Sequence, residues 1–179
     1  LFGMNGPIRG TLFNEEIYET GAELNANNFF NLAVEAEMAI KVDADINILS
    51  VFPIIELHNF IFRAPQKSLS ELIANNGLNR GLVTSAEIWQ KPPDFYQNKM
   101  SLSLEINGAE IDFGELWPME GGPLSSLHWL QNHLADHDLT ILPGNIILGG
   151  TALGLYKVRA GDRIDVKLDG EEAVNCFIN

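Results

Sequence analysis

The sequence predicts an α+β protein, built as a mixed β-roll or barrel with short helices. Three observations support this fold class. Segments in which apolar and polar residues alternate outnumber helical patterns, only two helices are expected and both are short, and the 16 glycines and 8 prolines are scattered along the chain, as in a turn-rich β protein. A doubly wound parallel sheet would need more helices between its strands.

The first strands are predicted from residues 34–42 and 51–62. In the first segment, apolar residues alternate with Glu35, Glu37, Ala39 and Lys41, a period of two that is typical of a strand with one buried face. The second segment is almost continuously apolar and indicates a more buried strand.

Two helices follow. The Ser68-Leu-Ser-Glu71 spacing is that of a capping box and Gly77 is a typical helix end, so we expect a helix over 69–76. Pro123 suits the first turn of a second helix, which a leucine stripe carries to about residue 136: Leu124, Leu127, Leu130 and Leu134.

The last third of the chain returns to strands. A turn at Leu142-Pro143-Gly144 precedes a strand over 145–148. Residues 164–169 alternate again, and Asp169-Gly170 predicts a hairpin into 173–178.

Length and composition indicate one domain, over residues 1–179, of catalytic type. The chain is 46% apolar and 20% charged, which is typical of a globular domain. It begins at Leu1, and no basic segment precedes a long apolar core as in a signal peptide. We therefore expect that an upstream N-terminal segment of the protein is missing from this chain.

The charge balance is strongly acidic, with 24 acidic and 11 basic residues and a formal net charge of −13. Such a chain repels phosphate backbones and anionic lipid, so we expect no nucleic-acid partner and no membrane partner. No apolar run reaches the roughly 18 residues of a membrane span. The single cysteine, Cys176, excludes a disulfide within the chain and suits the cytoplasm. A site for a divalent cation fits the charge best.

Three carboxylates are candidates for that site. Glu35 and Glu37 are two residues apart on one predicted strand, so they share a face. Glu56 lies inside an apolar run, where an unpaired carboxylate is costly. If the two strands are neighbours, the three carboxylates converge, and oxygen ligands of this kind suit Mg²⁺ or Mn²⁺. The simpler interpretation is that Glu35 and Glu37 face solvent and that Glu56 pairs with an arginine or lysine.

Other polar residues allow more than one interpretation. His58 shares the face of Glu56 and is a candidate general base or proton carrier, although a lone histidine is more often a polar core residue. Gly149, Gly150 and Thr151 follow a predicted strand, and their backbone amides could bind a substrate carboxylate; a plain turn is the alternative. His133 and His137 have a zinc-compatible spacing but no third ligand, so a solvated helix end is the better interpretation.

Several stretches, taken together, resemble the fumarylacetoacetate hydrolase superfamily. Within it, they are most similar to the branch of 2-oxopent-4-enoate hydratases and 2-oxo-3-hexenedioate decarboxylases. The segments run in family order and are Val34–Ile40 (resembling VEAEIAF), Pro53–Glu56 (PALE), Ile73–Gly77 (IADNAS), Gly122–Leu134 (DPLEALAWLANHL), Pro143–Thr151 (KPGDIVLTGS) and Ala160–Asp162 (AGD).

The resemblance implies a fumarylacetoacetate hydrolase-like β-roll that binds Mg²⁺ or Mn²⁺ through Glu35, Glu37 and Glu56. It implies a metal-dependent hydratase, a lyase, acting on a small 2-oxo-4-enoic acid such as 2-oxopent-4-enoate. In such enzymes the 2-oxo acid chelates the metal, which acts as a Lewis acid. Relatives form homo-oligomers, so we expect one here.

Departures from the family pattern leave two alternatives open. Asn59 and Asn75 stand where the family has Asp, Phe60 and Leu78 where it has Ser, and Gly149 replaces the first hydroxyl of TGS. The family's upstream lysine and acidic residue have no counterpart. The alternatives are a non-catalytic member that binds metal or ligand, or serves as an inactive partner subunit, and a 2-oxo acid decarboxylase.

Overall fold

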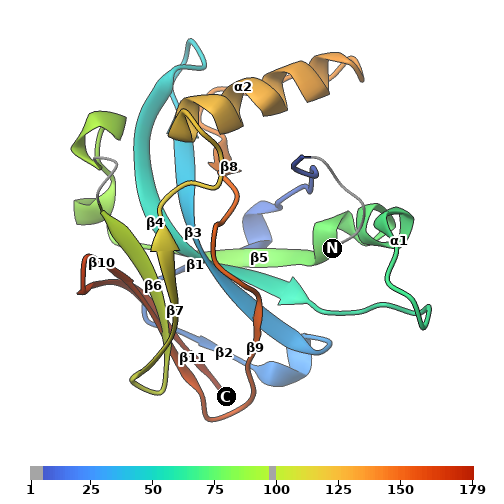
Figure 1. The fold of residues 1–179 in the computed structure, drawn as a ribbon, viewed down its shortest axis with the longest axis vertical. Helices are drawn as coiled ribbons and strands as arrows, with labels where there is room; N and C mark the ends of the chain where they lie inside the picture. Colours follow the sequence, from blue (N-terminus) through green and yellow to red (C-terminus); the bar gives the residue numbers. More distant parts are fainter. Residues whose placement is uncertain (1–5, 97–99) are drawn as a thin grey trace.

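The computed structural model describes residues 6–96 and 100–179 and consists of two β-sheets with a hydrophobic core between them (Figure 1). The predicted α+β β-roll is confirmed. Residues 1–5 and 97–99 of the predicted 1–179 domain lie outside the described part. The elements are β1 Ile17–Glu19, β2 Ala22–Leu24, β3 Leu32–Val42, β4 Ile48–Asn59, α1 Leu69–Ala74, β5 Asn79–Thr84, β6 Ser101–Ile106, β7 Ala109–Glu115, α2 Gly122–Ala135, β8 Ile146–Leu148, β9 Tyr156–Lys157, β10 Arg163–Leu168 and β11 Glu171–Ile178.

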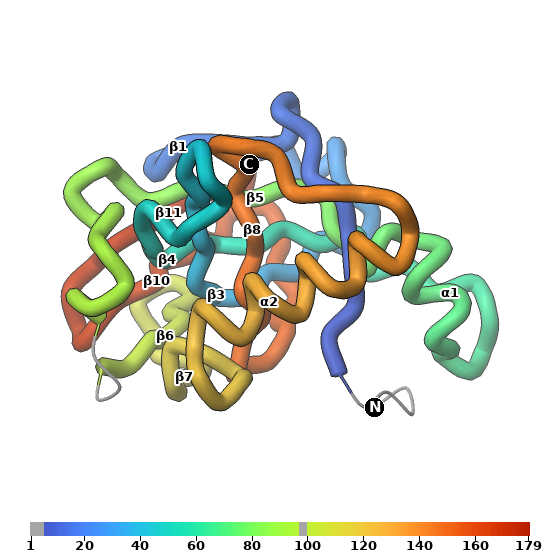
Figure 2. The backbone as a smooth tube through the Cα atoms, turned by 90° about the horizontal axis from the view of Figure 1, so that it is seen from above, coloured from blue at the N-terminus to red at the C-terminus, as the bar shows by residue number. Residues whose placement is uncertain are grey.

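The larger sheet has the order β1-β5-β4-β3-β8, with β9 also paired to β3. The second sheet has the order β2-β11-β10-β6-β7. Five short 3-10 turns connect these elements within the described residues: Asn14–Glu16, Ala26–Asn28, Asn76–Leu78, Glu87–Trp89 and Pro93–Phe95. Helix α2 crosses one end of the structure, and α1 lies at the far end of the larger sheet (Figures 1 and 2).

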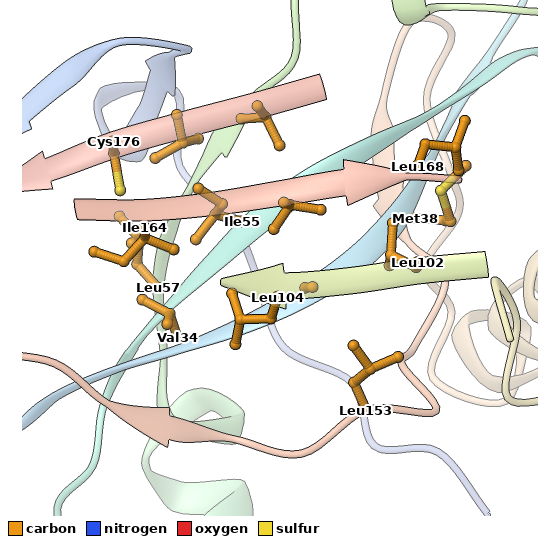
Figure 3. Packing of buried hydrophobic residues seen from close by; sticks show 14 of the residues in the cluster. Val34, Met38, Ile55, Leu57, Leu102, Leu104, Leu153, Ile164, Leu168 and Cys176 are labelled. Carbon is orange, nitrogen blue, oxygen red and sulfur yellow. The ribbon is translucent and has the colours of Figure 1, made fainter. Parts of the chain in front are cut away.

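The core is built from alternate residues of the long strands. Val34, Met38, Ile55 and Leu57 project from β3 and β4 toward side chains of the second sheet (Figure 3). Those opposing side chains are Leu102, Leu104, Ile164, Leu168 and Cys176. Because side chains alternate along a strand, the intervening residues of β3 and β4 face away from this core. That outer face carries the candidate site.

Most predicted elements are present, with shifted ends. The strand predicted at 51–62 is β4, which begins three residues earlier, at Ile48, and ends at Asn59. Its partner β3 begins at Leu32, after Asn31, whose positive φ of 58° turns the chain away and ends the pairing. The helix predicted at 69–76 ends at Ala74, and a 3-10 turn over Asn76–Leu78, with a left-handed Gly77, follows it. Ser68 caps this helix by accepting from the Glu71 amide at 3.2 Å.

The hairpin of β6 and β7 is an element that the sequence analysis missed. Asn107 and Gly108 form its turn, both with positive φ, and this dipeptide is a recognised hairpin signal. Within the described residues, no helix is both long and apolar enough to cross a membrane.

Candidate metal centre

The register of β3 and β4 places acidic residues directly opposite one another. Glu35 of β3 pairs with Glu56 of β4, and Ala33 pairs with His58. Directly opposed residues of antiparallel strands share a face, so Glu35, Glu56 and His58 all project from the outer face of the larger sheet. The predicted convergence of Glu35 and Glu56 is therefore present.

The side chains of Glu35, Glu56 and His58 form a tight group. One candidate ligand atom from each lies within 4.8 Å of the others. His58 Nε2 lies 3.5 Å from Glu35 Oε2 and 3.3 Å from Glu56 Oε2. Two carboxylates and an imidazole at these separations can surround one cation.

His58 is the cation of this group when no metal is bound. It is 5% exposed. Burial alone would lower the pKa of His58, but Glu56 and Glu35 raise it to about 10. Burial would likewise raise the pKa of Glu56, and the charge of His58 lowers it below its usual value instead. The sequence allowed an arginine or lysine as the partner of Glu56, and in the structure this partner is His58.

Glu37 lies one step further along β3 and is 2% exposed, so the solvent-facing interpretation is wrong for this residue. Its Oε1 accepts a hydrogen bond from the Gly150 amide. Burial, followed by the charges of Glu56 and Glu35, raises the pKa of Glu37 well above its usual value. Glu37 is not part of the close Glu35–Glu56–His58 group, although its carboxyl contacts Glu56.

Asn79 is a site residue that the sequence analysis missed. Its Nδ2 donates to Glu56 Oε1 at 2.6 Å and fixes the orientation of that carboxylate. The register of β4 and β5 shifts between Glu56 and His58, and this bulge lies at Gly81, which has a φ of +122°. A Cβ at Gly81 would lie 2.3 Å from the Glu16 carbonyl oxygen, so only glycine fits. A glycine within a strand pattern was the available signal.

The segment predicted to bind substrate lies beside Glu37, but its polar groups are engaged within the protein. The Gly149 amide donates to the Met38 carbonyl at 3.0 Å, and the Gly150 amide donates to Glu37. The Thr151 hydroxyl donates to the Ala36 carbonyl at 2.6 Å. These contacts position Glu37, and a role of the segment in substrate binding stays a prediction.

The asparagines that replace the family's Asp residues support loops around the site. Asn59 Oδ1 accepts from the Phe30 amide at 2.9 Å, and Asn75 Nδ2 donates to the Ile61 carbonyl at 3.2 Å. Both side chains thus hold neighbouring backbone in place. The rings of His133, on α2, and His137, in the turn that follows it, pack edge to face, and neither residue belongs to the close ligand group found among the described residues.

Basic side chains border the same face. Lys157 of β9 is paired with Ala33, so it projects from the face that carries Glu35 and His58. The ammonium groups of Lys157 and Lys67 lie 5.5 Å and 4.4 Å from the centre of the Phe60 ring. An exposed positive edge thus adjoins the acidic group.

Known proteins of similar sequence are decarboxylases and hydratases. A 4-oxalocrotonate decarboxylase of Pseudomonas putida is 23% identical over 186 residues, 97% of this chain and 70% of its own. A 2-oxo-hept-4-ene-1,7-dioate hydratase of Escherichia coli is 23% identical, over 95% of this chain and 70% of its own. Against a further Pseudomonas decarboxylase the chain spans 65% of the relative's length. No protein-family profile matches the chain.

Solved structures of similar fold contain divalent metal. The 4-oxalocrotonate decarboxylase of Pseudomonas putida G7, complexed with magnesium and adipate, superposes with a TM-score of 0.89 at 21% identity, covering 99% of this chain and 72% of its own. A fumarylpyruvate hydrolase of Pseudomonas aeruginosa, in complex with Mn²⁺ and pyruvate, gives a TM-score of 0.63 at 13% identity, covering 90% and 73%. The chain is thus a distant homologue of 4-oxalocrotonate decarboxylases and 2-oxo-hept-4-ene-1,7-dioate hydratase, and it has the fold of the fumarylacetoacetate hydrolase superfamily.

Proposed function

We propose that the protein is a divalent-metal-dependent hydratase acting on a small 2-oxo-4-enoic acid such as 2-oxopent-4-enoate. The observation that carries this proposal is the convergence of Glu35 and Glu56 around His58 on one face of the larger sheet, with Glu37 buried beside them. The hydratases among the chain's homologues support the reaction class.

The residues present fit a divalent cation. Three carboxylates lie on one face with a single imidazole among them, and burial, followed by the charges of Glu56 and Glu35, raises the pKa of Glu37. Glu35, Glu37 and Glu56 would hold Mg²⁺ or Mn²⁺. The bound ion supplies Lewis-acid stabilisation of the negative charge that develops on the keto oxygen of a 2-oxo acid.

The chain's own residues prepare this site in three ways. Asn79 and the Gly150 amide orient the carboxylates of Glu56 and Glu37. Hydrophobic side chains on the same face, Ala39, Phe52, Ile54 and Leu82, pack together beside the acidic group and exclude water from its base. Lys157 offers an exposed positive charge to an anionic substrate that the acidic protein would otherwise repel.

A turnover assay tests the proposal. Freshly generated 2-hydroxypenta-2,4-dienoate is mixed with the full-length protein, and the loss of its ultraviolet absorbance is followed with Mg²⁺ or Mn²⁺ and with EDTA. We expect loss that requires metal and that is abolished in Glu56→Gln. A Glu105→Gln variant, altered on the other sheet, controls for general damage. Absence of metal-dependent loss would favour a non-catalytic protein that binds metal or ligand, or an inactive partner subunit.

Decarboxylation is the second candidate reaction. The support is structural, since the decarboxylase complexed with magnesium and adipate superposes with a TM-score of 0.89. The same metal would stabilise the charge left when carbon dioxide departs. Release of carbon dioxide from 2-oxo-3-hexenedioate, with no turnover of the dienoate, would assign this reaction instead.

Assembly and location complete the proposal: a single-domain chain that forms a homo-oligomer in the cytoplasm. Large apolar side chains at Phe30, Ile88 and Phe113 are 67–71% exposed and offer surface for a second copy. The lone thiol of Cys176 is buried and free, in keeping with a reducing compartment. Light scattering coupled to size exclusion measures the assembly, and a purely monomeric protein would contradict it.

A further inference from the structure

We infer that His58 is itself a metal ligand, so that the centre binds a first-row transition ion through mixed nitrogen and oxygen donors in preference to Mg²⁺. The inference rests on the proposed metal-dependent function and adds the identity of one ligand and the class of ion. It replaces the proton-carrier role suggested by the sequence, because a nitrogen bound to metal carries no proton.

The distances around His58 fit a shared ion. Metal–nitrogen and metal–oxygen bonds in such sites are about 2.1 Å long, so two ligand atoms on one ion lie about 3.0 Å apart at a right angle and about 3.4 Å apart at the tetrahedral angle. His58 Nε2 lies 3.5 Å from Glu35 Oε2 and 3.3 Å from Glu56 Oε2. The distances from His58 Nε2 to the carboxylates of Glu35 and Glu56 are thus close to those between two ligands of the same metal ion.

The hydrogen bonding of His58 distinguishes a ligand from an ordinary buried ion pair. A charge-assisted hydrogen bond from nitrogen to a carboxylate is about 2.7–2.9 Å long. Both distances from Nε2 exceed this range, and neither ring nitrogen has a partner of hydrogen-bond geometry in the described part of the chain. The ring is buried, and its Nε2 lies between two carboxylates without being hydrogen-bonded to either.

The surrounding strands hold the ring in this position. Ala33, directly opposite on β3, is fully buried and small, which leaves room for the imidazole. On the other side, Asn79 pairs with His58 in the strand register but directs its amide to Glu56. The position of His58 is therefore set by packing, as a ligand position must be.

The donor set then determines the ion. Mg²⁺ prefers oxygen ligands and retains several waters, whereas the affinity of a nitrogen-containing site rises from Mn²⁺ through Co²⁺ to Ni²⁺, and imidazole also suits Zn²⁺. Replacing one water or carboxylate by His58 favours the later ions of this series. A centre in which His58 joins Glu35, Glu37 and Glu56 would still leave positions for a bidentate 2-oxo acid on a six-coordinate ion.

Spectroscopy of the metal-loaded protein tests the inference directly. The full chain is freed of metal with EDTA and loaded with Mn²⁺, and electron spin-echo modulation is recorded without substrate. We expect a ¹⁴N coupling from a directly bound nitrogen, lost in His58→Gln and retained in His128→Gln, an exposed histidine on α2. In calorimetric titrations, His58→Gln should weaken Co²⁺ binding by about tenfold or more and change Mg²⁺ binding by less than about threefold.

The outcomes separate this inference from the proposed function. Bound Mn²⁺ without nitrogen coupling in the wild-type protein overturns the role of His58 and leaves the carboxylate centre standing. No binding of Mn²⁺, Co²⁺ or Mg²⁺ overturns both. Should His58→Gln fail to fold, the wild-type coupling still decides, with His128→Gln, His133→Gln and His137→Gln showing that no other imidazole is its source.

Discussion

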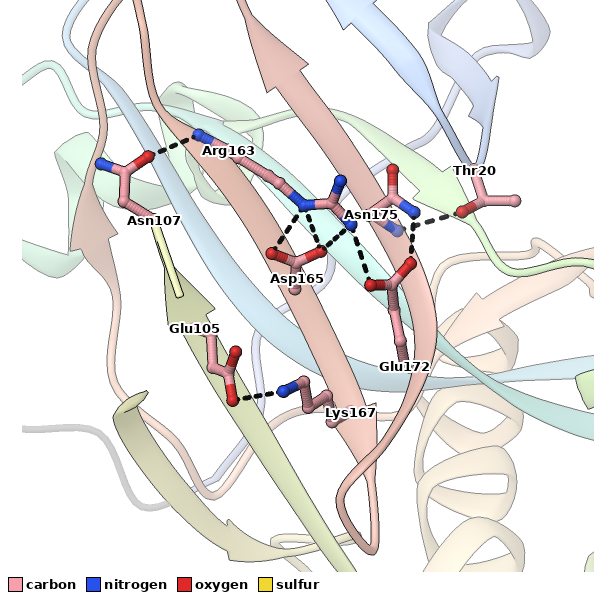
Figure 4. Close-up of polar contacts among 8 residues, drawn as sticks. All are labelled: Thr20, Glu105, Asn107, Arg163, Asp165, Lys167, Glu172 and Asn175. Atoms are coloured by element: carbon pink, nitrogen blue, oxygen red, sulfur yellow. Dashed lines mark hydrogen bonds and ion pairs between the residues drawn. The ribbon is translucent and has the colours of Figure 1, made fainter. Parts of the chain in front are cut away.

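Carboxylates lie on the outer faces of both sheets, and the two groups differ in what neutralises them. On the second sheet, Asp165 is 4% exposed and contacts the Arg163 guanidinium, with Nε 2.8 Å from its Oδ1 (Figure 4). Arg163 also contacts Glu172 at 2.8 Å, and Lys167 contacts Glu105 at 2.6 Å. Arginine and lysine remain charged at every relevant pH, so this network is permanently compensated.

On the larger sheet, Glu35, Glu37 and Glu56 share one titratable cation, His58. No arginine or lysine forms an ion pair with these three carboxylates within the described residues. The comparison teaches that carboxylates on alternating strands stabilise the fold where arginine or lysine neutralises them. Where no such cation meets them, they form the acidic group for which we propose a metal ion. Each of the following predictions alters one side of this comparison.

The largest effect is expected when a carboxylate of the acidic centre is removed. Glu35→Gln should weaken Mn²⁺ binding by at least about 100-fold, because it removes the charge of a proposed ligand with little change of shape. For comparison, loss of a residue that only orients a ligand costs about 10–100-fold in metal affinity. Glu105→Gln should bind Mn²⁺ like the wild type. Calorimetry of the metal-free proteins measures both, and equal affinities for Glu35→Gln and wild type would disprove the centre.

The metal-free protein should lose stability as pH rises above 6.5. The folded-state pKa of His58 is about 10, so its stabilising proton is retained by the folded chain after the unfolded chain has lost it near 6.5. The raised pKa of Glu37 acts in the same direction, since its burial disfavours the charged form. Urea unfolding in EDTA should show a decline of roughly 1 kcal/mol per pH unit between pH 7 and 9, below the single-proton limit of about 1.4. His58→Gln should flatten this slope, and a slope equal to wild type would contradict the assignment.

Removing the fixed cation of the second sheet should affect stability but not metal binding. Arg163→Met leaves Asp165 buried without its partner, and we expect the free energy of unfolding to fall by about 1–3 kcal/mol. Arg159→Met, at an exposed position, should change it by less than about 0.5 kcal/mol. Urea denaturation compares them; a shift in Mn²⁺ affinity for Arg163→Met would show that the two regions are coupled.

The smallest effect is expected at the positive edge of the site. Lys157→Met should raise the KM for the 2-oxo acid by about 3–10-fold and leave kcat nearly unchanged, because an exposed lysine attracts the anion but does not contact the reacting atoms. The effect should shrink in high salt. Lys91→Met, which removes a lysine stacked on a different ring, Phe95, is the matched control. An equal KM for both variants would remove Lys157 from substrate attraction.

Local patterns in the sequence predicted the two long strands, both helices and the C-terminal strands, but not β1, β2, β5, β6, β7 and β9. The alternation in β3, the leucine stripe of α2 and the Asp169-Gly170 turn are short-range signals that tertiary contacts reinforce. The end of β4 could not be predicted, because it depends on where Asn31 turns the partner strand. Strand β1 pairs with β5, although β3 and β4 lie between these two strands in the sequence. No local pattern encodes such a distant partner.

The site was predictable to the extent that spacing determines a face. The alternation along each strand predicted that Glu35 shares a face with Glu37 and that Glu56 shares a face with His58. The family resemblance implied that the carboxylates of the two strands belong to one site. The role of Asn79 was not predictable, since it depends on the strand bulge at Gly81. The engagement of Gly150 with Glu37 likewise depends on a contact between residues 113 positions apart in the chain.

The alternation of β3 has a consequence for how this protein can change over evolutionary time. Even-numbered positions such as Val34, Ala36 and Met38 are fully buried against the second sheet, while odd-numbered positions carry Glu35 and Glu37. Substitution at Glu35 can alter reactivity while leaving the side chains between the two sheets in place, and substitution at the even-numbered positions has the reverse effect. One strand therefore allows descendants to diversify in chemistry while inheriting an unchanged architecture.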